Sequence, residues 1–148
     1  MFKFSYEVFR PHRSVTAGFV MAAGICAALP AMADNFTTAG EVRPILTATR
    51  TSWVQLRERN GQDMLDFSQL GAWRCGLRTV HYRVNGGAEQ QLEMENCYEG
   101  DLRPNAVRDT AAWAISQAGG SVQNVDLRVT YDDGREDSVR LDRASIQR

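Results

Sequence analysis

The stretch 125–141, VDLRVTYDDGREDSVRL, alternates apolar and polar residues on both sides of the turn sequence at 132–134. This alternation is typical of strands with one buried face, and Gly134 suits the left-handed position of a tight turn. A three-residue loop places Leu127 opposite Val139 on the apolar face. The stretch therefore predicts an antiparallel hairpin with the further pairs Tyr131–Arg135, Val125–Leu141, Asp126–Arg140 and Thr130–Glu136.

A second turn signal lies at Asn60-Gly61, the preferred dipeptide for a two-residue type I′ loop. Pairing outward from this loop places Leu56 opposite Leu65, so that one face of the hairpin is apolar. The remaining pairs expected for this hairpin are Arg59–Gln62, Glu58–Asp63, Arg57–Met64, Gln55–Asp66 and Val54–Phe67.

A third hairpin is predicted around the Asn-Gly-Gly sequence at 85–87. A three-residue loop there pairs Val80 with Leu92, and the same count places Cys75 opposite Cys97. Directly opposed residues on antiparallel strands have the Cα separation that a disulfide needs. We therefore predict a Cys75–Cys97 disulfide, which stabilises the fold by roughly 3 kcal/mol on the chain-entropy model.

Two other segments are less clear. Residues 42–49, VRPILTAT, have strand-like composition, although Pro44 restricts them to an edge strand or a strand start. Residues 105–117 fit either a helix capped by Asn105 or a strand over 112–116, and the many short strands nearby favour the strand. The expected fold is mainly β, an antiparallel β-sandwich built from hairpins, with an immunoglobulin-like arrangement as one possibility.

The first 33 residues have the pattern of a secretory signal peptide. A positive segment precedes the apolar run 18–29, and Ala31-Met32-Ala33 is a small-x-small cleavage site. Cleavage leaves a single β-rich domain at 34–148, without a stable membrane anchor and with two of the three cysteines. An even cysteine pair in an exported domain indicates a disulfide, and the expected location is periplasmic or secreted.

Composition excludes several functional classes. The net charge of −1 argues against a nucleic-acid partner, which requires a basic excess. The sequence contains no G-x-S-x-G, H-E-x-x-H, P-loop or Rossmann glycine motif. The leading interpretation therefore assigns no catalytic residue, cofactor or metal ligand.

The carboxylates near Cys97 leave two alternatives open. Glu93 and Glu95 share a strand face and, together with His81, are candidates for a small envelope hydrolase. The acidic stretch 93–101 is also a candidate calcium site. The structural explanations are a solvated edge strand for the carboxylates and a polar strand face for the histidine.

The aromatic residues give the candidate ligand contacts. Trp53 is expected on the side of its hairpin opposite Val54, and an exposed aromatic beside arginines suits sugar or peptide contacts. Tyr98, next to the disulfide, is the second candidate contact. Trp73, two residues before Cys75, is expected to pack in the core.

Several short strings resemble a group of small exported proteins of unknown function from alphaproteobacteria. They are RPILTATR at 43–50, NGQD at 60–63, WRCGL at 73–77, NGG at 85–87, CYEG at 97–100, PNA at 104–106 and TYDDG at 130–134. The resemblance implies an envelope location and no catalytic activity. The sequence thus predicts a non-enzymatic binding module for an envelope protein or a small ligand, which an exposed sheet edge would allow through β-augmentation.

Overall fold

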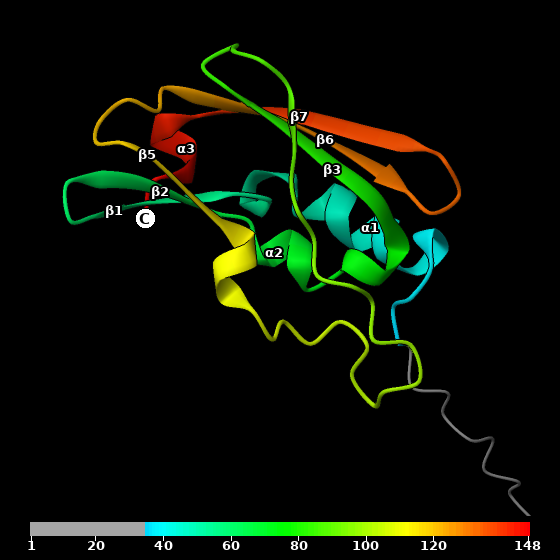
Figure 1. Ribbon diagram of the computed structural model, residues 1–148. Helices are drawn as coiled ribbons and strands as arrows, with labels where there is room; N and C mark the ends of the chain where they lie inside the picture. Colours follow the sequence, from blue (N-terminus) through cyan, green and yellow to red (C-terminus); the bar gives the residue numbers. More distant parts are fainter. Residues whose placement is uncertain (1–34) are drawn as a thin grey trace, which may run out of the picture. The chain divides into compact units, whose positions relative to one another are not determined.

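The computed structural model describes residues 35–148, so the predicted signal peptide lies outside the described part. The fold is mainly β, with two antiparallel sheets and short helices (Figure 1). The small sheet has the order β1-β2-β5, with β1 (Gln55–Arg59), β2 (Gln62–Asp66) and β5 (Ala114–Ala118). The large sheet has the order β4-β3-β6-β7, with β3 (Leu77–Val84), β4 (Gln90–Gln91), β6 (Asn124–Tyr131) and β7 (Glu136–Asp142).

Six helical segments accompany the sheets among the described residues. The α-helices are α1 (Ala39–Ala48), α2 (Ser68–Gly71) and α3 (Arg143–Ile146). The 3₁₀ turns are η1 (Arg50–Ser52), η2 (Arg74–Gly76) and η3 (Thr110–Trp113). Figure 1 shows α1, α2 and the small sheet on the same side of the large sheet.

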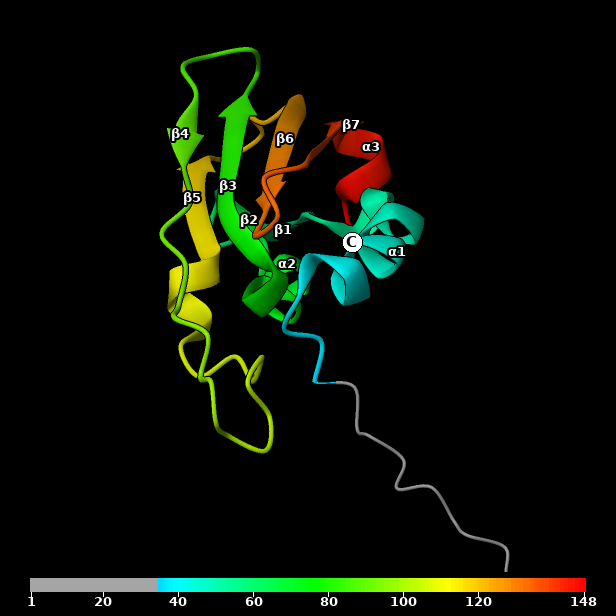
Figure 2. The same ribbon diagram turned by 90° about the vertical axis from the view of Figure 1, so that its right-hand side faces the viewer.

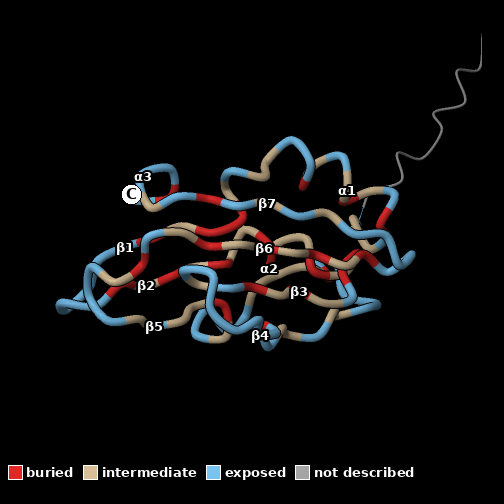
Figure 3. Tube along the Cα trace, turned by 90° about the horizontal axis from the view of Figure 1, so that it is seen from above, coloured by how far each residue is buried: buried red, intermediate tan, exposed pale blue. Residues whose placement is uncertain are grey.

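The sheets share one apolar core, as a sandwich requires. In β6 every second residue is buried, because the strand turns one face inward. Its buried residues pack with Leu56 and Leu65 of the small sheet and with Val42 and Leu46 of α1. Figure 3 shows this burial concentrated between the layers, with the outer strands and turns exposed.

An ion pair with a buried carboxylate joins β2 of the small sheet to α3, which follows β7 of the large sheet. Asp63 of β2 is fully buried and accepts a hydrogen bond from Arg143 in α3, at 2.6 Å. The Val122 N–H also donates to Asp63, at 3.0 Å. The hydrogen bond from Arg143 is the largest cause of a pKa for Asp63 well below its ordinary value, although burial opposes it.

The hairpins at the first and last turns confirm the predicted registers. Asn60 and Gly61 have φ of 52° and 73°, as a type I′ turn requires, and Leu56 pairs with Leu65. Leu127 pairs with Val139 in the β6–β7 hairpin, whose Gly134 has φ of 82°.

The expectation of strand-like structure at 42–49 is wrong, because α1 spans most of this stretch. Thr38 and Glu41 form a capping box, and Val42 and Leu46 recur at helical spacing toward the core. Pro44 sits inside this helix, where it removes one main-chain donor. Burial of the apolar face outweighs this loss.

The ambiguous segment 105–117 ends in a strand, as expected. One 3₁₀ turn, η3, ends at Trp113 and leads directly into β5. Asp109 caps this turn by accepting a hydrogen bond from the Ala111 N–H at 2.9 Å. The alternative helix starting at Asn105 does not form.

The third hairpin is confirmed only near its turn. Tyr82 pairs with Gln90, but the ladder ends at β4, and the next contact is the Leu92 N–H donating to the Val80 carbonyl. Residues 92–109, named the clamp loop below, then run without helix or strand. The Cys75–Cys97 disulfide is present with a Cα separation of 4.9 Å. The disulfide joins η2 to this loop and does not join two paired strands. The corresponding bridge of immunoglobulin domains joins the two sheets, so the arrangement here is different.

Candidate functional site

The clamp loop is the longest irregular segment between the elements of the described chain. It projects beyond the ends of the strands (Figure 2). Structureless loops of this length are uncommon in compact domains and are usually functional. The clamp loop is held in place by three anchors, and it presents one apolar side chain to solvent.

Arg74 is the first anchor of the loop. It is only 2% exposed, and it donates five hydrogen bonds to main-chain carbonyls. The accepting carbonyls belong to Gly71, Asn96, Pro104, Asn105 and Ala106. Because four of these lie in the loop, one buried guanidinium fixes both of its arms.

The disulfide and Asn105 form the second anchor. The Cys75 N–H donates to the Asn105 side-chain oxygen at 2.9 Å. The Asn105 amide nitrogen donates in turn to the Asn35 and Phe36 carbonyls, at 3.1 and 2.9 Å. The loop is thereby tied to both η2 and the segment before α1.

Glu95 is the third anchor and lies inside the loop. Its carboxylate accepts hydrogen bonds of 2.9–3.1 Å from four donors: the Tyr98 hydroxyl, the Trp113 indole N–H, and the main-chain N–H groups of Arg108 and Asp109. Burial of Glu95 raises its pKa, but the four donated hydrogen bonds outweigh this and lower the pKa to about 2. An ionised carboxylate with this many donors is a structural acceptor rather than a general acid.

Tyr98, a predicted ligand contact, is engaged within the loop. Its hydroxyl donates to Glu95, and the hydrogen bond to that carboxylate is the largest cause of the raised pKa of Tyr98. The Arg108 and Arg74 guanidinium carbons lie 3.7 and 5.0 Å from the ring centroid, within cation–π range. These contacts explain the half-buried Tyr98 as part of the loop's own packing.

Leu102 lies at the tip of this anchored loop. It is 97% exposed and is the one large apolar side chain at 35–148 that is exposed to this degree. A groove of about 300 Å³ next to it is lined by Phe36, Trp73 and Pro104. Trp73 packs only partly against the core, with its ring edge-on to Phe36 at 5.1 Å between the ring centroids. Among residues 35–148, nothing accepts a hydrogen bond from its indole N–H. The tip and the groove together form an apolar surface on a fixed loop.

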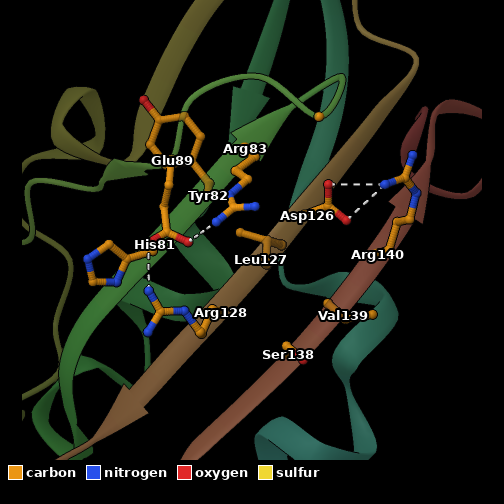
Figure 4. A pocket seen from close by; sticks show the side chains of 11 residues that line it. His81, Tyr82, Arg83, Glu89, Asp126, Leu127, Arg128, Ser138, Val139 and Arg140 are labelled. Carbon is orange, nitrogen blue, oxygen red and sulfur yellow. Dashed lines mark hydrogen bonds and ion pairs between the residues drawn. The ribbon is translucent and has the colours of Figure 1, made fainter.

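A second hollow lies on the outer face of the large sheet (Figure 4). It has a volume of about 560 Å³, and its charges are already paired. Glu89 bridges Arg83 and Arg128 at 3.1 and 2.7 Å, and Asp126 pairs with Arg140 at 3.2 Å. Because each of these arginines faces a carboxylate, this hollow offers an anion little uncompensated charge.

His81, Glu93 and Glu95 do not gather into one close cluster in the described part of the chain. His81 lines the sheet-face hollow, whereas neither glutamate is among the residues that line it. Glu93 is exposed and Glu95 belongs to the loop anchor. The alternating strand that was expected to align these residues ends at β4, so they no longer share a sheet face with the histidine.

The acidic stretch 93–101 does not gather ligands for calcium. Within the described residues, no three His, Cys, Asp or Glu side chains lie close enough to hold a metal ion. Glu95 already binds main-chain and side-chain donors, and Asp101 forms an ion pair with Arg108. Calcium requires six or more oxygen ligands, which this arrangement does not supply.

Trp53, the other predicted ligand contact, is fully buried, so that prediction is wrong. The chain turns through η1 just before Trp53, so the alternation assumed for an extended strand does not apply. Its indole N–H donates to the Leu46 carbonyl at 2.9 Å, which fastens the end of α1 to the core.

Comparison with protein-family models, curated proteins and solved structures gave no match. At 35–148, no helix has both the length and the apolar composition that a membrane span requires. The site therefore has to be interpreted from its own residues.

Two residues of the site, Arg74 and Leu102, were not predicted from the sequence. Arg74 is one of many arginines in the sequence, and nothing local marks it as buried. A single leucine in a polar turn is too common to indicate a contact.

Proposed function

We propose that this protein is a non-enzymatic interaction module of the cell envelope and that it binds a partner protein through the tip of the clamp loop. The observation that carries the proposal is an almost fully exposed Leu102 on an anchored loop. The anchors are the buried Arg74, the Cys75–Cys97 disulfide and the hydrogen-bonded carboxylate of Glu95. Binding residues are often placed on loops that a rigid scaffold positions.

Anchoring lowers the cost of binding. A free loop loses conformational entropy when it docks, whereas a loop already fixed in one conformation does not pay most of that cost. The Leu102 side chain is flanked by the exposed charged residues Asp101 and Arg103. An apolar centre with a charged rim is the usual composition of a protein interface, so a protein with a small apolar pocket is the expected partner.

The disulfide supports the location. Disulfides persist in oxidising compartments, and Cys75–Cys97 is therefore typical of a protein outside the reducing cytoplasm. The predicted signal peptide at 1–33 and the resemblance to exported proteins favour the periplasm within that range.

Site-specific photo-crosslinking tests the proposal in the producing cell. A photoreactive amino acid at Leu102 is expected to give one dominant adduct with an envelope protein. The same group at Arg59, exposed at the tip of the β1–β2 hairpin, serves as the matched control. Adducts of equal pattern at both positions, or none at position 102, would contradict a loop-specific partner.

The captured partner then allows a quantitative test. Leu102→Asp should weaken its binding by about tenfold or more, because a charge is buried where an apolar contact was made. Arg59→Asp should leave binding unchanged. Both positions are exposed, so both variants should retain the wild-type melting temperature. Equal binding of wild type and Leu102→Asp would show that the tip is not the contact.

A further inference from the structure

The free edges of the two sheets differ in their protection against pairing with another strand. Natural sheets protect edges with charges, very short strands or covering segments. β7 carries the charged residues Glu136, Asp137, Arg140 and Asp142, and η1 reaches it through the ion pair of Arg50 with Asp137. β1 is covered where the Arg148 N–H donates to the Leu56 carbonyl at 3.1 Å, and β4 has only two residues.

β5 has none of these protections. Its sequence, AISQA, contains no charge and no proline, and it pairs with β2 along one side only. Seen from above, β5 lies at the outer border of the molecule (Figure 3). An uncharged edge strand of this kind is a template for a further strand.

One hydrogen bond fixes which main-chain groups of β5 point outward. The Phe67 N–H donates to the Trp113 carbonyl at 2.7 Å, just beyond the β2–β5 ladder. Opposed pairs in an antiparallel ladder alternate between bonded and non-bonded, so Ile115 and Gln117 bond to β2. The residues that turn their main-chain groups to the free edge are Ala114, Ser116 and Ala118.

Two of these six outward groups are satisfied within the chain. The Ala114 N–H donates to the Ala111 carbonyl, and the Ala118 carbonyl accepts from the Ser121 N–H at 3.0 Å. Among the hydrogen bonds of residues 35–148, four groups stay without a partner. They are the carbonyls of Ala114 and Ser116 and the N–H groups of Ser116 and Ala118.

We propose that a second copy of this chain pairs along β5, antiparallel and related by a two-fold axis at Ser116. Each Ser116 N–H donates to the Ser116 carbonyl of the other copy, and each Ala118 N–H donates to the other copy's Ala114 carbonyl. This pairing uses all four free groups of each copy. The two groups that face each other without bonding, the Ala114 N–H and the Ala118 carbonyl, are the two already satisfied within the chain.

The side chains fit the same symmetry. Ile115 of one copy faces Gln117 of the other, so no like charges meet and a partly exposed isoleucine is covered. The two small sheets become one six-stranded sheet through an isologous interface. A single strand buries little area, so the dimer is expected to be weak and to depend on concentration. The pairing residues of β5 lie outside the clamp loop, so the dimer does not depend on the proposed function.

Disulfide trapping tests the predicted axis. With Ser116→Cys, the two introduced thiols face each other at a Cα separation of about 5.5 Å, which a disulfide spans. The purified variant, with its native disulfide intact, should therefore form a covalent dimer under mild oxidation. The control is Ala118→Cys, which is equally exposed but whose two thiols lie far apart across the axis. Ser116→Cys should form the covalent dimer at least about tenfold faster than this control. Equal rates for the two variants, or no covalent dimer with the fold intact by circular dichroism, would overturn the proposal.

Sedimentation provides the second measurement. The wild-type protein should self-associate reversibly as its concentration rises toward about 1 mM, as expected for a small interface. Ser116→Pro removes an outward N–H that makes no bond within the chain, and it should leave a folded monomer. A wild type that stays monomeric at the highest concentration, or a Ser116→Pro variant that still dimerises, would refute pairing along β5.

Discussion

The β6–β7 hairpin and the clamp loop reach a fixed conformation by different routes. In the hairpin, each residue pairs with the one reached by counting outward from the turn, as with Leu127 and Val139, and alternate pairs exchange main-chain hydrogen bonds. In the loop, the bonds converge on Arg74 and Glu95, which lie far from many of their partners in the sequence. The hairpin distributes its order over many similar bonds, whereas the loop concentrates its order in a few side chains.

This difference predicts unequal responses to single substitutions. A hairpin that loses one favourable turn residue keeps its ladder and its apolar face. A loop that loses an anchor leaves several buried carbonyls or N–H groups without partners at once, and each such group costs about 1–3 kcal/mol. Anchor substitutions should therefore be the most destabilising, and turn substitutions the least.

Arg74→Met is expected to have the largest effect, a loss of about 4 kcal/mol in the free energy of unfolding. The substitution keeps the apolar stem of the side chain but removes the donors to five carbonyls. Urea denaturation with the disulfide intact measures the loss. Hydrogen exchange at the Tyr98 N–H, which donates to the Pro104 carbonyl, reports on the loop itself.

Two controls accompany this variant. Arg57→Met, on the exposed side of β1, should change the free energy of unfolding by no more than about 0.5 kcal/mol. Arg74→Lys should fall between Arg74→Met and the wild type, because an ammonium group has fewer donors in a less fixed geometry. If Arg74→Met cost no more than the Arg57 control, the loop would not depend on its buried arginine.

Glu95→Gln should cost about 2–3 kcal/mol at neutral pH, because the amide replaces a charged acceptor that binds four donors. The pKa of Glu95 is about 2 in the folded protein, below the ordinary 4.5. Its stabilisation is therefore complete above pH 4.5 and is lost as the pH falls toward 2. The stability difference between wild type and variant should shrink over the same interval.

The indole N–H of Trp113 gives a direct readout of this titration, since it donates to Glu95. Its NMR shift in the wild-type protein should change with a midpoint near 2 and not near 4.5. Acid also weakens the Asp63–Arg143 pair, because the pKa of Asp63 is lowered as well, but wild type and variant share that loss. A difference between the two that stayed constant with pH would remove Glu95 as an ionised anchor.

The same contrast explains how far the sequence could predict the structure. Turn sequences such as Asn60-Gly61 set a register by local geometry, so the β1–β2 and β6–β7 hairpins were predictable residue by residue. The Cys75–Cys97 pairing was predicted correctly from a ladder that ends well before the cysteines. The outcome was right because the loop brings Cys97 back to η2, which no local rule describes.

The errors arise where residues outside a segment decide its conformation or its burial. The segment 42–49 has strand-forming residues, but burial against the core and a capping box favour a helix. Trp53 follows a 3₁₀ turn, which changes the side it faces. At the candidate site, Tyr98 was predicted as a contact residue, but its partner Glu95 and the exposed Leu102 were not predicted in these roles. Contacts between distant segments decide the positions of both Tyr98 and Leu102.

Gly134→Ala should have the smallest effect of the three, about 1 kcal/mol. Gly134 has φ of 82°, and a Cβ there would meet nothing closer than an arginine side chain at 3.9 Å, so the cost is one of backbone conformation alone. Gly134→Asn should cost less than the alanine variant, because asparagine tolerates this conformation better. Thermal unfolding of the pair measures both losses. A loss above about 3 kcal/mol for Gly134→Ala would place the hairpin with the clamp loop, as a structure that fails when one residue is changed.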